Sequence, residues 1–416
     1  MRGAVVRSFP VVSIWSAARR LSVCLCGAVA MAGFGAGPAS AGQTTHPTTS
    51  PGTLAAFGDS ITRSCCHQMA GNDWPSQVGK AAGLTVYNEG IGAQTSTQVA
   101  VRMNAYAGTQ AQTFASAFTI PISGSVTVAF PPGDEPCYQA GIQGPAVLLA
   151  TVVSGVAYEG KCTQAGSSYR FTPTAYPTGA VNVPAGNAWT AVLGSELSGW
   201  VSIEAGRNNY QSPSVVLADI AAMVAVARRN TTHWSVMTIL NSDLEPIGTA
   251  QYRTIRSENA RLASLYGSHV VDIRSALVSH YDRSFAPDVA DHGNDIPPLS
   301  LKSGWVLGRL TAPIADTSTC TFSISAPVGA NGLILTVDSE DIRYENPTTC
   351  VRGEYGTTPA THASGAPVYA IDWLHPGANT HSAHNPNCAG AGGYACIAQE
   401  YEAWLVRAGS DARQGP

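Results

Sequence analysis

Charged side chains are scarce in this chain of 416 residues. Only 12% of the residues are Asp, Glu, Lys or Arg, and no basic stripe appears along the sequence. Proteins that bind nucleic acid use clustered Lys and Arg to neutralise phosphates. The composition therefore argues against a nucleic-acid partner, while 44% hydrophobic residues are enough for a large core.

The chain also lacks a hydrophobic run that suits a membrane span. The apolar stretch LSVCLCGAVAMAGFGAG is short and rich in glycine, follows Arg19 and Arg20, and precedes an A-x-A pattern at 39–41. These features are typical of a cleaved export signal. We expect residues 1–41 to be a signal peptide and the product to be secreted or periplasmic, without stable membrane insertion. Cleavage leaves 19 basic against 27 acidic residues, a net charge of −8, which disfavours an acidic polymer as substrate except at a local patch.

A third absence concerns catalysis. No G-x-S-x-G sequence occurs in the chain. That motif forms the nucleophile elbow of the α/β-hydrolase esterases. An enzyme of that fold is therefore not indicated.

What the chain does contain is an alternation of short apolar segments and amphipathic ones. Strands are predicted for TLAAFGDS, LTVYNEG, GWVSIEAG, WSVMTIL and HVVDI, and helices for WPSQVGKAAG, PSVVLADIAAMVAVARRN, QYRTIRSENARLASLYG and GGYACIAQEYEAWLVRAG. Such alternation is typical of βαβ units. It predicts an α/β fold with a parallel sheet and helices on both faces.

Two segments interrupt this alternation, at 112–198 and 306–368. Both carry short alternating runs such as GSVTVAF and LILTVDS, separated by turn residues and without a helical period. We interpret them as β-rich insertions. Because both leave the core shortly before a candidate catalytic segment, they are placed to wall the active site.

Ten cysteines are present, and eight follow the predicted signal peptide. An exported chain favours disulfides. Proximity in the sequence suggests Cys137–Cys162, Cys320–Cys350 and Cys388–Cys396, which leaves the neighbours Cys65 and Cys66. Those two form either a vicinal disulfide or links to the loop that carries Cys388 and Cys396.

The segment FGDSIT places Ser60 at the end of a predicted strand, just before a helix. Open α/β sheets bind ligands beyond the carboxyl ends of their strands, and a helix N-terminus stabilises an oxyanion. Ser60 is therefore a candidate nucleophile. The alternative is that Asp59 or Ser60 merely caps the helix.

Three distant segments favour the nucleophile. Asp372 precedes His375 by three residues in AIDWLHPGA, a spacing that lets a carboxylate orient an imidazole toward a serine hydroxyl. NEGIGAQTS and IEAGRNNY each follow a predicted strand. Strand ends of a parallel sheet meet at one edge, so these parts are expected to converge.

Together these four segments resemble the SGNH (GDSL-type) hydrolase family, over about 42–111, 199–305 and 369–408. The resemblance implies a flavodoxin-like three-layer α/β/α core with the two β-rich insertions outside it. It assigns Ser60 as nucleophile, His375 as base and Asp372 as the residue that orients the base. The implied oxyanion hole consists of the Ser60 and Gly92 backbone N–H groups and the Asn208 side chain, with Ala93 as the alternative to Gly92. The family has Asp where this chain has Asn209.

The resulting hypothesis is a secreted serine esterase that hydrolyses carboxylic esters through a Ser-His-Asp triad and an acyl-enzyme. The resemblance implies short acyl groups, on a small molecule or a glycan, and no cofactor. The alternatives are a carbohydrate- or surface-binding module on the same scaffold and an O-acyltransferase. A zinc site at His375, His381, His384, Cys388 and Cys396, or an Asp/His metal site around His292, is less favoured than a disulfide-closed loop and a solvated loop.

Overall fold

The computed structural model describes residues 52–64, 73–139, 145–321, 323–325, 333–338, 340–346, 349–354, 357–377, 387–390 and 392–414. The predicted signal peptide lies outside the described residues, as do Cys65, Cys66, His381 and His384. Among the described residues, no helix is long and apolar enough to cross a membrane.

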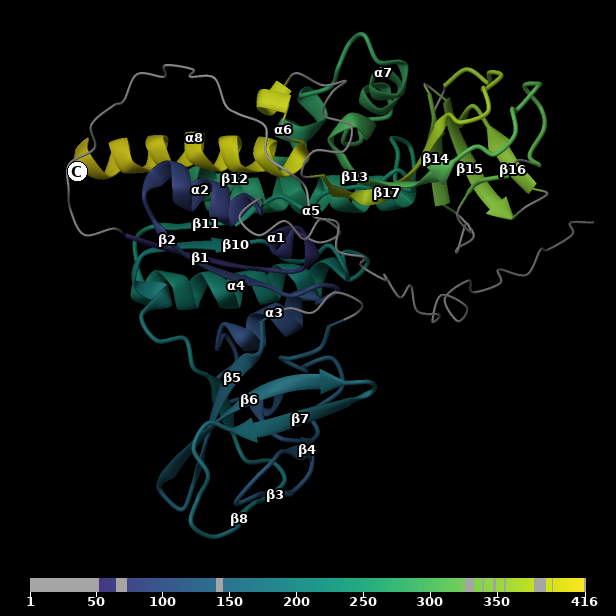
Figure 1. Cartoon of the computed structure of the whole chain (residues 1–416). Helices are drawn as coiled ribbons and strands as arrows, with labels where there is room; N and C mark the ends of the chain where they lie inside the picture. Colours follow the sequence, from purple (N-terminus) through teal and green to yellow (C-terminus); the bar gives the residue numbers. More distant parts are fainter. Residues whose placement is uncertain are drawn as a thin grey trace, which may run out of the picture. The chain divides into compact units, whose positions relative to one another are not determined.

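A five-stranded parallel sheet forms the core and confirms the predicted α/β class (Figure 1). Its order is β2-β1-β10-β11-β12. Its strands are β1 (Thr53–Gly58), β2 (Thr85–Gly90), β10 (Trp200–Ile203), β11 (Trp234–Met237) and β12 (Val270–Val271). When the strands are numbered in chain order within this sheet, the order is 2-1-3-4-5, as in flavodoxin-like folds. The strand order reverses between β1 and β10.

Helices cover both faces of this sheet. They are α1 (Ser60–Arg63), α2 (Trp74–Ala82), α3 (Ser96–Arg102), α4 (Pro213–Asn230), α5 (Ala250–Tyr266), α6 (Ile273–Ser279), α7 (Ala286–Gly293) and α8 (Gly393–Gln414). Apolar residues of α2, α6 and α8 pack in one cluster against one face, and residues of α3, α4 and α5 pack in a second cluster against the other (Figure 1). The result is the predicted three-layer arrangement.

Local chemistry explains where the helices begin and end. Asp73 caps α2 by accepting a hydrogen bond from the Ser76 backbone N–H at 2.9 Å, and Pro75 occupies the first turn. Gly83 ends α2 with a left-handed φ of 68°. Pro213 begins α4 at the predicted residue. Helix start and stop signals of this kind can be recognised in the sequence.

The segment 112–198, interpreted from its sequence as β-rich, folds as antiparallel sheets. Its strands are β3 (Phe118–Ile120), β4 (Val126–Val128), β5 (Val147–Val153), β6 (Val156–Ala165), β7 (Ser168–Pro173), β8 (Val181–Val183) and β9 (Trp189–Ala191). Phe114, Phe130 and Trp189 are buried in its core, next to the Cys137–Cys162 disulfide. This first β-module thus has its own hydrophobic core.

A second antiparallel sheet has the order β13-β17-β14-β15-β16. Its strands are β13 (Lys302–Arg309), β14 (Leu333–Val337), β15 (Glu340–Asn346), β16 (Thr349–Arg352) and β17 (Pro367–Pro376). Strands β13 and β17 therefore extend beyond the predicted 306–368 segment on both sides. The Cys320–Cys350 disulfide links this second β-module internally. Because β17 also carries Asp372 and His375, the module continues directly into the candidate site.

Candidate active site

Ser60 is the first residue of α1 and follows directly on the buried strand β1. The carboxylate of the preceding residue, Asp59, caps the helix by accepting from the Ile61 N–H at 2.9 Å. The capping role that the sequence left open therefore belongs to Asp59. The hydroxyl of Ser60 is left to make a different contact.

The close approach of chain segments at Gly58 fixes the turn before Ser60. A Cβ atom on Gly58 would lie 2.1 Å from Thr62 Oγ1 and 2.7 Å from the Glu204 carbonyl oxygen. Neither distance is sterically possible. Only glycine lets the end of β1 pack this tightly against both α1 and β10.

His375 joins Ser60 to Asp372. The Ser60 Oγ atom lies 2.8 Å from His375 Nε2, and His375 Nδ1 lies 2.9 Å from Asp372 Oδ2. The other carboxylate oxygen of Asp372 accepts from the backbone N–H groups of Leu374 and His375, both at 2.8 Å. The side chains of Ser60, His375 and Asp372 thus form one continuous chain of hydrogen bonds.

The environment of Asp372 favours its charged form. Burial alone would raise the pKa of this carboxyl, but the His375 imidazole and the two backbone donors outweigh burial and lower the pKa to about 2. An ionised Asp372 keeps the hydrogen of His375 on Nδ1. Nε2 is then free to accept the hydroxyl hydrogen of Ser60.

A bulge in β17 places Asp372 and His375 toward Ser60. Between the pairs Gly304↔Ile371 and Lys302↔Pro376, β13 advances by two residues while β17 advances by five. The extra residues of β17 leave the ladder as a local turn that Asp372 caps. Bulges of this kind re-aim side chains next to active sites. The Asp-x-x-His segment singled out in the sequence is therefore built into a strand of the second β-module.

Asn208 lies beside Asp59 and the segment that follows β2. Its Nδ2 group donates to Asp59 Oδ2 at 3.2 Å and to the Gln94 carbonyl oxygen at 2.9 Å. Gly92 and Ala93 immediately precede Gln94, in a turn after β2 where Ala93 has a left-handed φ of 64°. The segments that the sequence singled out for the oxyanion hole therefore lie next to each other and to the residue before Ser60.

Asn209 stands where the resembling family has Asp, and it has a structural partner. Its Oδ1 accepts from the Ser96 backbone N–H at 3.0 Å, and its Nδ2 donates to Ser96 Oγ at 2.9 Å. Ser96 is the first residue of α3. An amide, which both donates and accepts, suits this pair of contacts and fixes the start of α3.

Sequence reasoning missed the buried polar residues beneath the site. Arg102 donates to the Gly58 carbonyl oxygen at 3.0 Å and to Gln94 Oε1 at 2.7 Å. Glu204 Oε2 accepts from the Asp59 N–H at 3.3 Å and from the Thr62 hydroxyl at 3.2 Å. Burial, followed by the neighbouring Asp59 carboxylate, raises the pKa of Glu204. The signal in the sequence that could have revealed Glu204 is its charge, because it directly follows the apolar strand β10.

The first β-module contacts the candidate site through hydrogen bonds to the Gln94 side chain. The side-chain amide of Gln94 donates to the carbonyl oxygens of Pro136 and Tyr138, each at 2.9 Å. Gln98, one helical turn further on, donates to Glu135 at 2.9 Å. The loop that contains Cys137 is thereby held next to the Gly92–Ala93 turn.

Lys302, at the start of β13, forms buried ion pairs that connect the second β-module with the core. Its ammonium group is buried and pairs with Asp243, and it lies 3.2 Å from Asp291 of α7. Burial raises the pKa of Asp243 to about 6, and the positive charge of Lys302 opposes a larger rise. Lys302 is also the ladder partner of Pro376, the residue after His375. This ion cluster therefore supports the strand that carries the candidate base.

Replacing Lys302 with Met is expected to lower the free energy of unfolding by about 3–5 kcal/mol, because two buried carboxylates lose their cation. Urea denaturation monitored by tryptophan fluorescence measures this change. Lys161→Met, at an exposed position of β6, is the matched control and should cost under about 0.5 kcal/mol. Equal stability of the two variants would contradict this role of Lys302.

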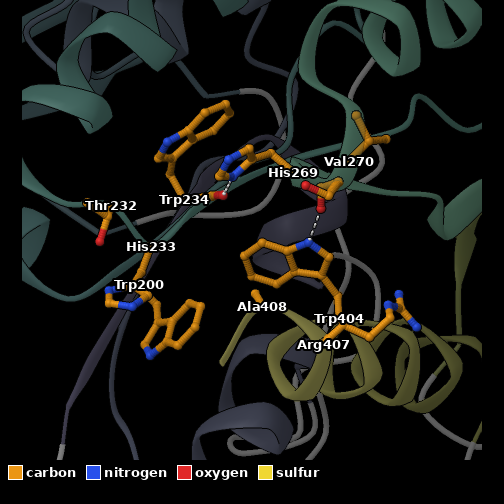
Figure 2. Close-up of a pocket in the computed structure, with 10 residues that line it drawn as sticks. Trp200, Thr232, His233, Trp234, His269, Val270, Trp404, Arg407 and Ala408 are labelled. Atoms are coloured by element: carbon orange, nitrogen blue, oxygen red, sulfur yellow. Dashed lines mark hydrogen bonds between the residues drawn. The ribbon is translucent and has the colours of Figure 1, made fainter. Parts of the chain in front are cut away.

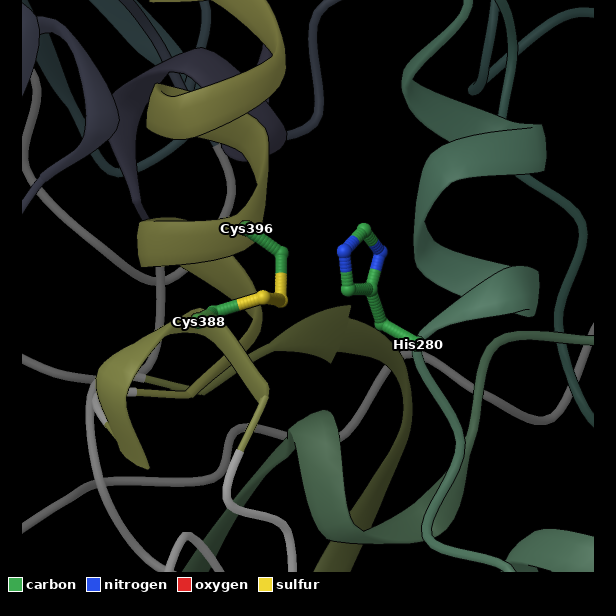
Figure 3. Close-up of side chains that lie close together, drawn as sticks. All are labelled: His280, Cys388 and Cys396. Carbon is green, nitrogen blue, oxygen red and sulfur yellow. A yellow bond between two sulfur atoms is a disulfide. The ribbon is translucent and has the colours of Figure 1, made fainter.

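The metal-ligand candidates of the tail have other partners. Cys388 and Cys396 form a disulfide, so their sulfurs are not thiolate ligands, although His280 lies beside them (Figure 3). His280 Nδ1 donates to the Ala276 carbonyl oxygen at 2.6 Å. His292 stacks on Tyr281 with ring centroids 3.9 Å apart. The structure joins the three cysteine pairs suggested by sequence proximity. Because Cys388 and Cys396 are bonded to each other, they are not available for the alternative links to Cys65 and Cys66, which lie outside the described residues.

Comparisons with known proteins find similarity only among solved structures. No protein-family model matches the chain, and no curated protein does. A structure from Desulfitobacterium hafniense DCB-2, described as a lipolytic protein of the G-D-S-L family, aligns with 15% identity and a TM-score of 0.28, covering 54% of this chain and 79% of that one. The SGNH-hydrolase family esterase AlinE4 aligns with 12% identity and a TM-score of 0.29, covering 54% and 77%. At this level of similarity, function has to be argued from the residues of this chain.

Proposed function

We propose that this chain is a secreted serine esterase that hydrolyses carboxylic esters with short acyl groups. The main support for the proposal is the chain of hydrogen bonds from Ser60 Oγ through His375 to Asp372. These three residues come from the end of β1 and the bulge of β17. Their arrangement has the atoms and the order that a serine nucleophile, its base and its orienting carboxylate require.

In the acylation step, Ser60 Oγ attacks the ester carbonyl carbon while His375 Nε2 takes the hydroxyl hydrogen. Collapse of the tetrahedral intermediate breaks the bond to the alcohol, which leaves with the hydrogen that His375 returns. Water then attacks the acyl-serine with His375 again as base, and the carboxylic acid leaves. Asp372, ionised because its pKa lies at about 2, stabilises the imidazolium formed in each step.

The oxyanion of the intermediate is proposed to be held by the backbone N–H groups of Ser60 and Gly92 and by the Asn208 side chain. Ala93 is the alternative to Gly92, because both residues lie in the same turn. Asn208 would exchange its longer contact, 3.2 Å to Asp59, for the oxyanion and keep the 2.9 Å contact to Gln94. Each such donor supplies about 3 kcal/mol of transition-state stabilisation.

Active-site labelling tests the proposal directly. The mature protein is incubated with a fluorophosphonate probe and digested, and the labelled peptide is identified by mass spectrometry. We expect one adduct, on Ser60, together with loss of activity on p-nitrophenyl acetate. A panel of p-nitrophenyl esters from acetate to octanoate, and acetylated xylan, then defines the acyl length. An unlabelled protein without activity on every ester would favour the binding-module alternative, and a transesterified sugar as main product would favour acyl transfer.

Asn208→Ala is expected to lower kcat by about 100- to 1,000-fold with little change in KM, because the donor acts mainly in the transition state. Steady-state kinetics on p-nitrophenyl acetate measure both parameters. Asn230→Ala, at the exposed end of α4, is the matched control and should leave kcat unchanged. If Asn208→Ala changed KM alone, the side chain would be a substrate-binding group and not an oxyanion donor.

A further inference from the structure

Two adjoining cavities lie at the edge of the parallel sheet opposite to Ser60. The first has a volume of about 570 Å³ and is lined by residues from the starts of β10, β11 and β12 and from α8 (Figure 2). The second has a volume of about 540 Å³ and shares Thr232, Trp234 and His269 with the first. Ser60 follows the carboxyl end of β1, whereas these residues lie at the amino ends of the neighbouring parallel strands. The cavities are therefore separate from the candidate active site.

Aromatic side chains form the walls of the first cavity. Trp234 stacks on His269 with ring centroids 3.8 Å apart and planes 3° apart, and Trp200 meets Trp404 edge-on at 5.7 Å (Figure 2). Trp404 is held by a hydrogen bond from its indole N–H to the Ser268 carbonyl oxygen at 2.7 Å. Trp200 is only half-buried. These contacts hold Trp234 and Trp404 in place. Trp200 also lies against His233, with ring centroids 4.4 Å apart, and presents the remaining part of its indole to a ligand.

The charge of this region differs from that of the chain as a whole. The chain has more acidic than basic residues, yet none of the described residues lining the two cavities is Asp or Glu. Arg407 lines the first and the exposed Arg228 lines the second. Arg407 also contacts Glu400 at 3.3 Å; Arg407 is exposed and Glu400 is partly exposed, so solvent screens this pair. The two cavities, taken together, favour an anionic ligand.

Hydrogen-bonding groups surround the aromatic walls. Thr231, Thr232 and Ser268 carry hydroxyls at the cavities. His269 Nδ1 donates to the Trp234 carbonyl oxygen at 2.8 Å, so this nitrogen carries the hydrogen and Nε2 is the acceptor in the neutral ring. Aromatic faces, hydroxyls and guanidinium groups together match the apolar face, hydroxyls and carboxylate of an acidic sugar.

We propose that these two cavities form a binding site for an anionic saccharide, remote from the esterase site. The indole of Trp200 contacts a sugar ring, and Arg228 and Arg407 form ion pairs with the carboxylates of the saccharide. The site would hold an acidic glycan while Ser60 acts elsewhere on the same or another molecule. The proposal does not depend on the esterase function.

Isothermal titration calorimetry on the Ser60→Ala protein tests the site without interference from hydrolysis. The probes are trigalacturonate, neutral galactotriose, AMP and inorganic phosphate. We expect trigalacturonate to bind at least about tenfold more tightly than the other three probes, with an affinity that falls as salt is raised. No binding of trigalacturonate, equal binding of galactotriose or phosphate, or tighter binding of AMP would each overturn the proposal.

Substitutions locate the binding. Arg228→Ala and Arg407→Ala should each weaken trigalacturonate binding by about tenfold, the loss typical of a charge-assisted hydrogen bond. Both side chains are exposed, so the fold is preserved. Arg229→Ala, the exposed neighbour on α4 that lines neither cavity, is the matched control. Trp200→Ala should also weaken binding, with circular dichroism as the check on folding. Unchanged binding in both arginine variants would place the ligand elsewhere and overturn the proposal.

Discussion

Replacing Ser60 with alanine is expected to lower kcat on p-nitrophenyl acetate by about five orders of magnitude. The variant lacks Oγ, the atom that attacks the ester carbonyl carbon in the proposed acylation step, so the acyl-enzyme cannot form. His375 and Asp372 keep their mutual hydrogen bond, which does not involve Ser60. The free energy of unfolding should therefore change by only about 1 kcal/mol, the value of one hydrogen bond.

The measurement is steady-state hydrolysis with both proteins at equal, verified concentration, together with urea denaturation of each. Ser264→Ala, at an exposed position of α5, controls for the loss of a hydroxyl and should retain full kcat. A Ser60→Ala protein that is folded and within tenfold of the parent kcat would refute the proposed nucleophile. Equal inactivity of both proteins on every ester tested would instead refute the esterase function.

Changing Asp372 to Asn is expected to lower kcat by about four orders of magnitude. The amide does not stabilise the imidazolium, and its NH₂ group can donate to the imidazole, which favours the hydrogen on Nε2. That hydrogen would face Ser60 Oγ, which lies 2.8 Å away, and block proton transfer. The effect should appear in kcat at every pH at which the parent enzyme is active.

The same substitution has a predictable effect on stability. Despite burial, the His375 imidazole and the backbone donors lower the pKa of Asp372 to about 2 in the folded chain, whereas an unfolded Asp has a pKa near 4. Its ionised form therefore contributes about 2 kcal/mol above pH 4, and this contribution is lost as the pH falls toward 2. The Asn variant should show a flatter dependence of unfolding free energy on pH between 4 and 2. Asp316→Asn, an exposed site in the second β-module, is the control for kcat and should leave it unchanged. An Asp372→Asn enzyme within tenfold of the parent kcat would show that His375 needs no orienting carboxylate.

The parallel core was readable from the sequence because its signals are local. Apolar runs of strand length, amphipathic helices between them, Pro213 at the start of one helix and Gly83 at the end of another each act within a few residues. The same holds for the two β-rich runs that contain β4 and β14. Where neighbours along the chain determine the structure, the sequence predicts it.

The sequence by itself determined which residue types are available for chemistry: a serine after a buried strand, an Asp-x-x-His segment and an Asn after the third core strand. Only the tertiary structure decided which of Asp59 and Ser60 caps α1, how far β17 extends and that its bulge turns His375 toward Ser60. The two residues in that contact are 315 positions apart. Likewise, Trp200, Trp234 and Trp404 come from three distant segments and meet only in the folded chain. No local pattern encodes such contacts, because they depend on how the sheet and the β-modules pack.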